Sequence, residues 1–122
     1  MATVLYVDDE EAIQRAIRSW LVRRGHHVFT AGSAAAAVAL LDEQTVDGAF
    51  IDIWLGTESG FDLYETISMR WPDVARNAAF VTGDIIREPE VDRALAIFKR
   101  PVLTKPFELG ELERTIGSWT IS

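Results

Sequence analysis

The sequence predicts an α/β protein in which a five-stranded parallel sheet lies between two layers of helices. Five short apolar runs alternate with segments whose apolar residues recur at helical spacing. This alternation is typical of βαβ units, because parallel strands need a crossover connection that is usually a helix. With 122 residues, the chain can bury one core and has little room for a second. We therefore expect residues 1–122 to form a single domain.

The apolar runs predict the strands Thr3–Val7, His27–Thr30, Ala49–Ile51, Ala78–Val81 and Val102–Thr104. The first, third and fourth runs are continuously apolar, which is typical of central strands covered by helices on both faces. Right-handed crossovers between five parallel strands favour the flavodoxin-like order 2-1-3-4-5, a (βα)5 three-layer sandwich. In that order the chain switches direction between strands one and three, so a ligand is expected at the carboxyl ends of these strands.

Each predicted helix has an apolar stripe and, in most cases, an end signal. Gly25 lies where a left-handed C-terminal cap is expected, Ser33 is an expected N-cap, and Pro72 is expected to stop the third helix. Pro89 suits the first turn of the fourth helix, whereas residues 83–88 before it could be loop. The apolar positions, in chain order, are Ile13, Ile17, Trp20 and Leu21; Ala34, Ala37, Val38 and Leu41; Leu63, Tyr64 and Ile67; Val91, Leu95 and Phe98; and Leu109, Leu112, Ile116 and Trp119.

Composition excludes several classes of function. The chain has 12 basic and 19 acidic side chains and a net charge of -7, which argues against direct binding to nucleic acid, because that affinity depends on Lys and Arg displacing counterions. It contains no cysteine, which excludes disulfides and thiolate sites. We found no apolar run near the roughly 20 residues of a membrane span, and no signal-peptide pattern. A cytoplasmic location without membrane contact is therefore the expectation.

Polar residues stand where the predicted central strands end. Asp8 and Asp9 follow the first strand, Asp52 the third, Thr82 the fourth and Lys105 the fifth. In the predicted strand order these side chains converge at one edge of the sheet. Carboxylates in contact repel by about 4 kcal/mol per pair at an effective dielectric near 20, so a cation must offset them. Lys105 supplies one charge and a divalent cation, with Mg²⁺ favoured, supplies the rest; this chemistry indicates phosphoryl transfer to Asp52.

Four motifs and one glycine resemble those of the receiver domain of bacterial two-component response regulators, over essentially the full length of the chain. Gly60, eight residues beyond Asp52, stands where that family has a loop glycine. The motifs are Val7-Asp8-Asp9-Glu10, Phe50-Ile51-Asp52-Ile53, Val81-Thr82-Gly83 and Thr104-Lys105-Pro106-Phe107.

The resemblance implies a role for each site residue. Asp52 would accept a phosphoryl group from the phosphohistidine of a histidine kinase and later lose it by hydrolysis. Thr82 and Lys105 would bind the phosphoryl oxygens, and the Lys105-Pro106 bond would be cis. The Mg²⁺ ligands would be Asp8, Asp9, Asp52 and the main-chain carbonyl of Trp54, with Asp9 a direct ligand. Such a domain is a signalling module rather than an enzyme, and its phosphorylation would change binding to a downstream protein partner or to a second copy in a homodimer.

The chain departs from the family pattern in two places, and a third segment resembles a subgroup of the family. Val102 stands three residues before Lys105, where many members have Tyr or Phe that moves inward with the threonine, so the switch through Thr82 and Val102 is expected to be weakened. The loop 55–60 lacks a proline that often follows the phosphoacceptor. Residues 87–100 resemble receivers attached to, or serving, sensor histidine kinases.

Other interpretations of the same residues remain open. The chain could be a pseudo-receiver, a scaffold that is never phosphorylated, or a Mg²⁺-dependent phosphatase that works through an aspartyl phosphate. Asp9 or Glu10 could cap the first helix while Asp8 and Asp9 face the site. The Trp54 side chain either flanks the mouth of the site or lies away from it. His26 and His27 fall at the far end of the sheet, where a metal or catalytic role is not expected.

Overall fold

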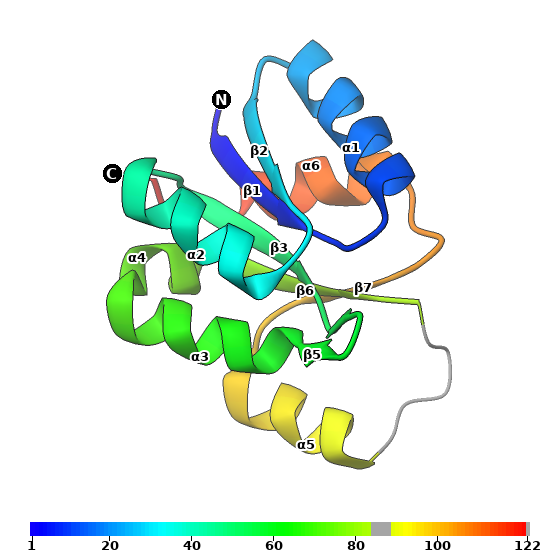
Figure 1. The fold of residues 1–122 in the computed structure, drawn as a ribbon. Helices are drawn as coiled ribbons and strands as arrows, with labels where there is room; N and C mark the ends of the chain where they lie inside the picture. Colours follow the sequence, from blue (N-terminus) through cyan, green and yellow to red (C-terminus); the bar gives the residue numbers. More distant parts are fainter. Residues whose placement is uncertain (84–88, 122) are drawn as a thin grey trace.

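The computed structural model describes residues 1–83 and 89–121, and its sheet has the predicted topology. Five parallel strands lie in the order β2-β1-β3-β6-β7, which is the order 2-1-3-4-5 when these strands alone are counted (Figure 1). The switch between β1 and β3 is where the sequence placed it. The strands are β1 Thr3–Val7, β2 His27–Ala31, β3 Gly48–Asp52, β6 Ala78–Thr82 and β7 Val102–Thr104.

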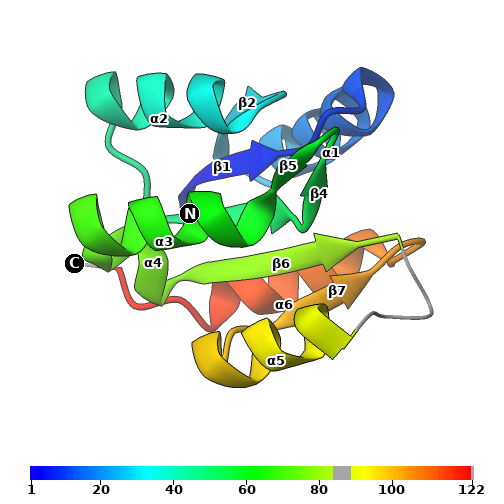
Figure 2. The ribbon, with the colours of Figure 1, turned by 60° about the horizontal axis from the view of Figure 1, so that its bottom comes forward.

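Helices cover both faces of the sheet, so the three-layer prediction is confirmed. One face is covered by α1 and α6, and the other by α2, α3, α4 and α5 (Figures 1 and 2). The helices are α1 Glu11–Arg23, α2 Ala34–Glu43, α3 Gly60–Arg70, α4 Pro72–Arg76, α5 Pro89–Phe98 and α6 Leu109–Gly117.

The central strands are buried on both faces. Successive side chains of β3 point to opposite sides, so Phe50 packs with α1 and α6 while Ile51 packs beneath α2, α3 and α5. Both side chains, and those of Tyr6 and Phe80 on neighbouring strands, are fully buried. Each such side chain contributes about 1.5–3 kcal/mol by leaving water. The continuous apolar runs in the sequence are therefore explained by two cores that share one sheet.

Several end signals act as predicted. The Ser33 hydroxyl accepts a hydrogen bond from the Ala36 main-chain N–H at 3.1 Å, which caps α2. Gly25 has φ +93° just after α1, in the left-handed region that glycine tolerates best. Helix α5 begins at Pro89. The sequence analysis considered residues 83–88 a possible loop. Residues 84–88 of this stretch lie outside the described residues.

Helix α3 ends at Arg70, before Pro72, as predicted. Pro72 then opens the short helix α4, because proline is well suited to a first helical turn. Other local features differ from the expectations. The expected loop 55–60 contains part of a two-stranded hairpin, β4 Trp54–Leu55 and β5 Glu58–Ser59. Trp119 is buried as predicted, yet it lies beyond the end of α6. Within the described residues, no helix combines the length and apolar character needed to cross a bilayer.

The carboxylate cap of the first helix, one of the open interpretations, is not formed by Glu10. Glu10 occupies the N-cap position of α1, but its side chain makes no capping hydrogen bond. Its main-chain N–H instead donates to Asp8 Oδ1 at 3.0 Å. The start of α1 is thereby tied to the carboxyl end of β1, and Asp8 is held where the sheet ends.

Candidate functional site

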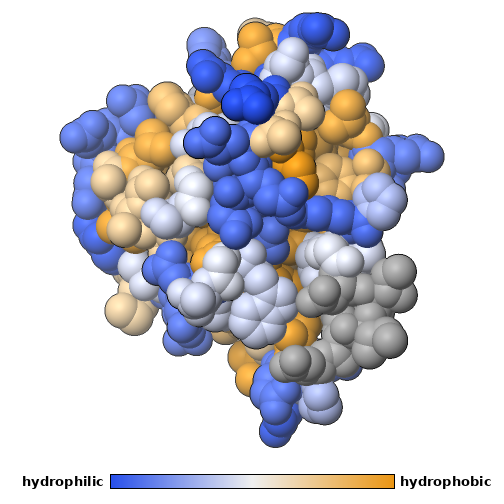
Figure 3. Space-filling view, turned by 45° about the vertical axis from the view of Figure 1, so that its right-hand side comes forward, coloured by the Kyte–Doolittle hydropathy of each residue, from blue (hydrophilic) through white to orange (hydrophobic). Residues whose placement is uncertain are grey.

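The five predicted polar residues lie at one edge of the sheet. Asp8 and Asp9 follow β1, Asp52 is the last residue of β3, Thr82 is the last residue of β6, and Lys105 follows β7. The arrows of β1, β6 and β7 point the same way in Figure 2, so their carboxyl ends share an edge. Hydrophilic residues gather at the centre of the face that this edge presents (Figure 3).

Lys105 joins carboxylates that come from two separate strands. Its Nζ donates to Asp8 Oδ2 at 2.8 Å and to Asp52 Oδ2 at 2.9 Å, with Glu10 Oε1 at 3.9 Å. The side chains of Asp8 and Asp52 are 0% and 9% exposed and that of Lys105 is 17% exposed. Bonds this short in so little water are strong, charge-assisted hydrogen bonds. Two buried acids and one ammonium therefore form a single electrostatic unit.

Asp52 is fixed by the loop that follows it. Its Oδ1 accepts a hydrogen bond from the Trp54 main-chain N–H at 3.0 Å, so its second oxygen is the one that faces Lys105. Gly60 allows the loop to return close to the main chain of Asp52. A Cβ at Gly60 would lie 2.1 Å from the Asp52 carbonyl oxygen, so only glycine fits there. The glycine picked out by the family resemblance thus has a steric reason.

Asp8 is held by residues that the sequence analysis missed. The Tyr6 hydroxyl donates to Asp8 Oδ2 at 3.2 Å, and the Gln14 side-chain amide donates to the Asp8 carbonyl. The Glu10 main-chain N–H occupies the other carboxylate oxygen. Tyr6 looked like an ordinary core residue of an apolar strand. The signal that could have found it is the spacing of two, which puts both side chains on the same face of β1.

The acidic residues after β1 provide a donor set for a divalent cation. Asp8, Asp9 and Glu10 offer carboxylate oxygens that lie within 4.8 Å of one another, and Asp9 and Glu10 are exposed. Hard oxygen ligands of this kind suit Mg²⁺ or Ca²⁺. Glu10 joins the group although the sequence did not predict it as a ligand. Ligation by Asp52 and by the Trp54 carbonyl stays a prediction.

Burial and charge shift the pKa values of this unit. Burial raises the pKa of the Asp52 carboxyl above its ordinary value, and it outweighs the lowering by hydrogen bonds from Lys105 and the Trp54 N–H. Burial by itself lowers the pKa of Lys105, but its bonds to Asp8 and Asp52 more than offset this and the net shift is upward. Both pKa values are therefore raised, that of Asp52 by burial and that of Lys105 by its bonds to two carboxylates. Lys105 therefore stays an ammonium at neutral pH.

Thr82 lies at the end of β6 next to Lys105, whereas Val102 is the first residue of β7. Thr82 is 2% exposed, and its carbonyl accepts a hydrogen bond from the Lys105 main-chain N–H at 2.7 Å. Val102 is half-buried and pairs in register with Phe80. Like Phe98, it packs against the core on the face of the sheet covered by α2, α3, α4 and α5. The proposed roles of Thr82 and Val102 in switching stay predictions. The Trp54 side chain is 43% exposed, two residues from Asp52.

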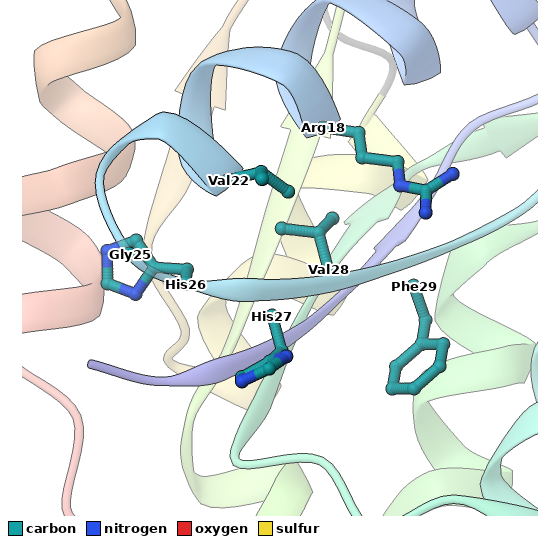
Figure 4. A pocket seen from close by; sticks show the side chains of 7 residues that line it. All are labelled: Arg18, Val22, Gly25, His26, His27, Val28 and Phe29. Atoms are coloured by element: carbon teal, nitrogen blue, oxygen red, sulfur yellow. The ribbon is translucent and has the colours of Figure 1, made fainter.

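The histidines lie at the far end of the sheet. His26 is buried, its Nδ1 accepts a hydrogen bond from the Ala2 main-chain N–H at 3.0 Å, and its Nε2 bonds to Glu113. His27 is exposed beside it. Figure 4 shows a pocket at this end, where the end of α1 turns into β2. The bonds of His26 tie β1 and β2 to α6, which is a structural task.

The fold and the site together define the class of protein. A five-stranded parallel sheet with an acidic pair, an aspartate, a threonine and a lysine at its carboxyl edge is the arrangement expected of a phosphoacceptor domain. The sequence model of the family described as the response regulator receiver domain matches residues 4–117. The chain therefore belongs to the response regulator receiver domain family.

Relatives and solved structures agree with this assignment. The chain is 42% identical over 57% of its length to the alginate biosynthesis transcriptional regulatory protein AlgB of Pseudomonas putida, of which it spans 15%. It is 33% identical, over its whole length, to the heme response regulator HssR of Staphylococcus aureus, of which it spans 60%. The solved structure of the chemotaxis protein CheY4 of Vibrio cholerae has the same fold, with a TM-score of 0.85 at 24% identity, over 98% of this chain and 99% of that one.

Proposed function

We propose that Asp52 accepts a phosphoryl group from the phosphohistidine of a sensor histidine kinase in a Mg²⁺-dependent reaction, and that this changes binding to a protein partner. The observation that carries the proposal is the shared lysine. Lys105 bonds at 2.8 and 2.9 Å to carboxylates on two different strands, at the edge of the sheet where ligands bind in this fold. An ammonium in this position is within reach of a group attached to Asp52.

The residues present suit an in-line displacement. An Asp52 carboxylate oxygen would form the bond to phosphorus while the bond from phosphorus to the imidazole nitrogen breaks, and the imidazole would take up a proton. Water would later attack phosphorus and release phosphate, which regenerates the carboxylate. Lys105 would neutralise phosphoryl oxygens with its charge, and Thr82 would donate a hydrogen bond to them.

The acidic residues at the carboxyl edge of the sheet offer oxygen ligands for Mg²⁺. Asp8, Asp9 and Asp52, with the Trp54 main-chain carbonyl, would hold Mg²⁺, which would neutralise phosphoryl charge when bound. The grouping of Asp8, Asp9 and Glu10 supports this part of the proposal. Glu10 would act at the exposed rim of the same group.

We also propose how the domain works in its setting. Residues 1–122 would act as one receiver domain in the cytoplasm, without turning over an external substrate. The output would be a protein contact, with a downstream partner or with a second copy of the chain. Direct contact with nucleic acid or a membrane is disfavoured by the net charge of -7, because both surfaces are rich in phosphate.

The test is the intact mass of the protein after incubation with Mg²⁺ and acetyl phosphate. We expect one phosphoryl group per chain, which hydroxylamine removes and which is absent when EDTA is present. Asp52→Asn should abolish the increase. Asp47→Asn is the matched control, because Asp47 is a half-buried aspartate at the other end of the sheet, where it accepts a hydrogen bond from the Thr3 N–H at 2.7 Å.

Each competing function makes a different prediction in this experiment. A pseudo-receiver would show no increase in mass under any condition. An increase that survives Asp52→Asn would place the phosphoryl group elsewhere. Sustained release of phosphate from p-nitrophenyl phosphate by the purified protein, lost in Asp52→Asn, would indicate a phosphatase.

A further inference from the structure

A tyrosine hydroxyl is buried beneath the site. Tyr6 lies in β1, its side chain is fully buried, and its ring centroid is 6.3 Å from that of Phe50. The Phe50 ring in turn lies 5.5 Å from Trp119. These contacts fix the ring by packing on the face covered by α1 and α6. The hydroxyl nevertheless reaches Asp8 Oδ2 at 3.2 Å.

The same oxygen of Asp8 has one fixed donor and one movable donor. Tyr6 donates from a rigid ring, whereas Lys105 donates from a flexible four-carbon chain and divides its ammonium between Asp8 and Asp52. The Glu10 N–H serves the other oxygen. If Lys105 moves to a phosphoryl group on Asp52, Asp8 Oδ2 keeps the Tyr6 hydroxyl as a donor.

We propose that Tyr6 is a positioning residue, whose hydroxyl keeps the buried Asp8 carboxylate bonded and oriented while Lys105 turns to the phosphoryl group. This inference rests on the proposed function. A buried carboxylate that loses donors is destabilised, so Asp8 without Tyr6 would compete harder for Lys105. The phosphorylated state, which needs Lys105 at the phosphoryl oxygens, would then form less readily.

We expect the loss of the Tyr6 hydroxyl to affect binding at the phosphoryl position more than binding of the cation. Before a phosphoryl group is present Lys105 remains with Asp8, so loss of the Tyr6 hydroxyl should change affinity for Mg²⁺ alone by about twofold or less. Affinity for beryllofluoride in saturating Mg²⁺ should fall roughly tenfold, about 1.4 kcal/mol. The probe is suitable because beryllofluoride occupies the place of a phosphoryl group on a carboxylate.

The experiment compares the whole chain with Tyr6→Phe and with Tyr64→Phe. Tyr6→Phe keeps the ring and removes only the hydroxyl. Tyr64→Phe makes the same change in a buried tyrosine on the other face of the sheet, where the ring packs against Phe80 and Phe98. Titrations with Mg²⁺ alone and with beryllofluoride would be followed by NMR, well below the unfolding temperature.

The outcomes distinguish this inference from the proposed function. A loss in Tyr6→Phe that is specific to beryllofluoride, with Tyr64→Phe unchanged, supports the positioning role. Equal beryllofluoride affinity in all three proteins overturns that role and leaves the proposed function standing. An equal loss for Mg²⁺ and beryllofluoride also overturns it. A wild-type chain that does not bind beryllofluoride refutes the proposed function itself.

A second measurement uses only the wild-type chain and so remains decisive if Tyr6→Phe does not fold. The exchange rate of the Tyr6 hydroxyl proton with water would be measured by NMR with labelled tyrosine, with and without beryllofluoride and Mg²⁺. We expect the proton to stay protected in the bound state, because the bond to Asp8 persists. Rapid exchange only in the bound state would show that the bond breaks and would overturn the inference.

Discussion

The two ends of the parallel sheet both bury polar side chains, but they satisfy them differently. At the carboxyl end, Asp8 and Asp52 share the ammonium of Lys105, so each charge depends on another side chain that can move. At this end one ammonium serves two carboxylates.

At the amino end, the buried polar side chains bond mainly to the main chain. Asn77 donates to the carbonyls of Asp47 and Thr120, each at 2.8 Å, and accepts from the Thr120 N–H at 3.0 Å. These hydrogen bonds join uncharged groups, and the donors and the acceptor of the Asn77 amide all have partners. The comparison teaches that burial of polar groups alone does not mark a functional site; buried charges with exchangeable partners do.

The largest effect is expected when the shared cation is removed. Lys105→Met leaves Asp8 and Asp52 buried without their ammonium, and breaking such a pair costs about 3 kcal/mol. Urea unfolding in metal-free buffer would measure this loss, and added Mg²⁺ should recover part of it. Phosphorylation by acetyl phosphate should also slow by roughly 100-fold. Unchanged stability would mean that the two carboxylates do not depend on the lysine.

At the opposite end, Asn77→Ala should cost about 2 kcal/mol in the free energy of unfolding, because it leaves main-chain groups of Asp47 and Thr120 without partners. The rate of phosphorylation by acetyl phosphate should not change. A slowed rate in the folded variant would contradict the separation of the two ends.

Asp52→Asn should stabilise the protein by about 1 kcal/mol at neutral pH in metal-free buffer. The pKa of the folded Asp52 carboxyl is raised by burial, so the folded wild type loses stability as pH rises from the ordinary aspartate value through the raised one. The gain from the substitution is therefore present above that window and disappears near pH 3, below the ordinary value of about 3.9. Urea unfolding at both pH values measures it, and an equal gain at both would exclude the carboxylate as its source.

The smallest effect concerns transmission away from the site. Val102 is half-buried in β7, where an aromatic side chain could follow a movement of Thr82. We expect Val102→Tyr to increase, by about twofold, the NMR shift changes that beryllofluoride causes in α5, β7 and α6. Partner affinities of both forms should change as well. Shift changes equal to those of the wild type would refute a coupling role for this position.

The fold could be predicted because its signals are local. The cap at Ser33 depends only on neighbouring residues. The strand that contains Ile51 is continuously apolar because both of its faces are buried. The site could be predicted because strand ends in a parallel sheet meet at one edge, which brings Asp52 and Lys105 together from far apart in the sequence.

What could not be predicted depends on side-chain geometry across elements. The spacing of two places Tyr6 and Asp8 on one face, but only the position of the Tyr6 hydroxyl reveals the bond to Asp8. The hairpin of β4 and β5 depends on Gly56 at φ +63°, which the loop composition alone does not require. Glu10 stands at the N-cap of α1 without a side-chain capping bond, which its position in the sequence does not reveal.

A Mg²⁺ titration followed by amide NMR tests the comparison of the two ends most directly. We expect saturable shifts at millimolar Mg²⁺ for the amides of Asp9, Glu10 and Trp54, and none for those of His26 and Asn77. In Asp8→Asn the shifts at the carboxyl end should require much higher Mg²⁺. Shifts scattered over both ends, or none at any concentration, would contradict a convergent cation site and the phosphoacceptor function built on it.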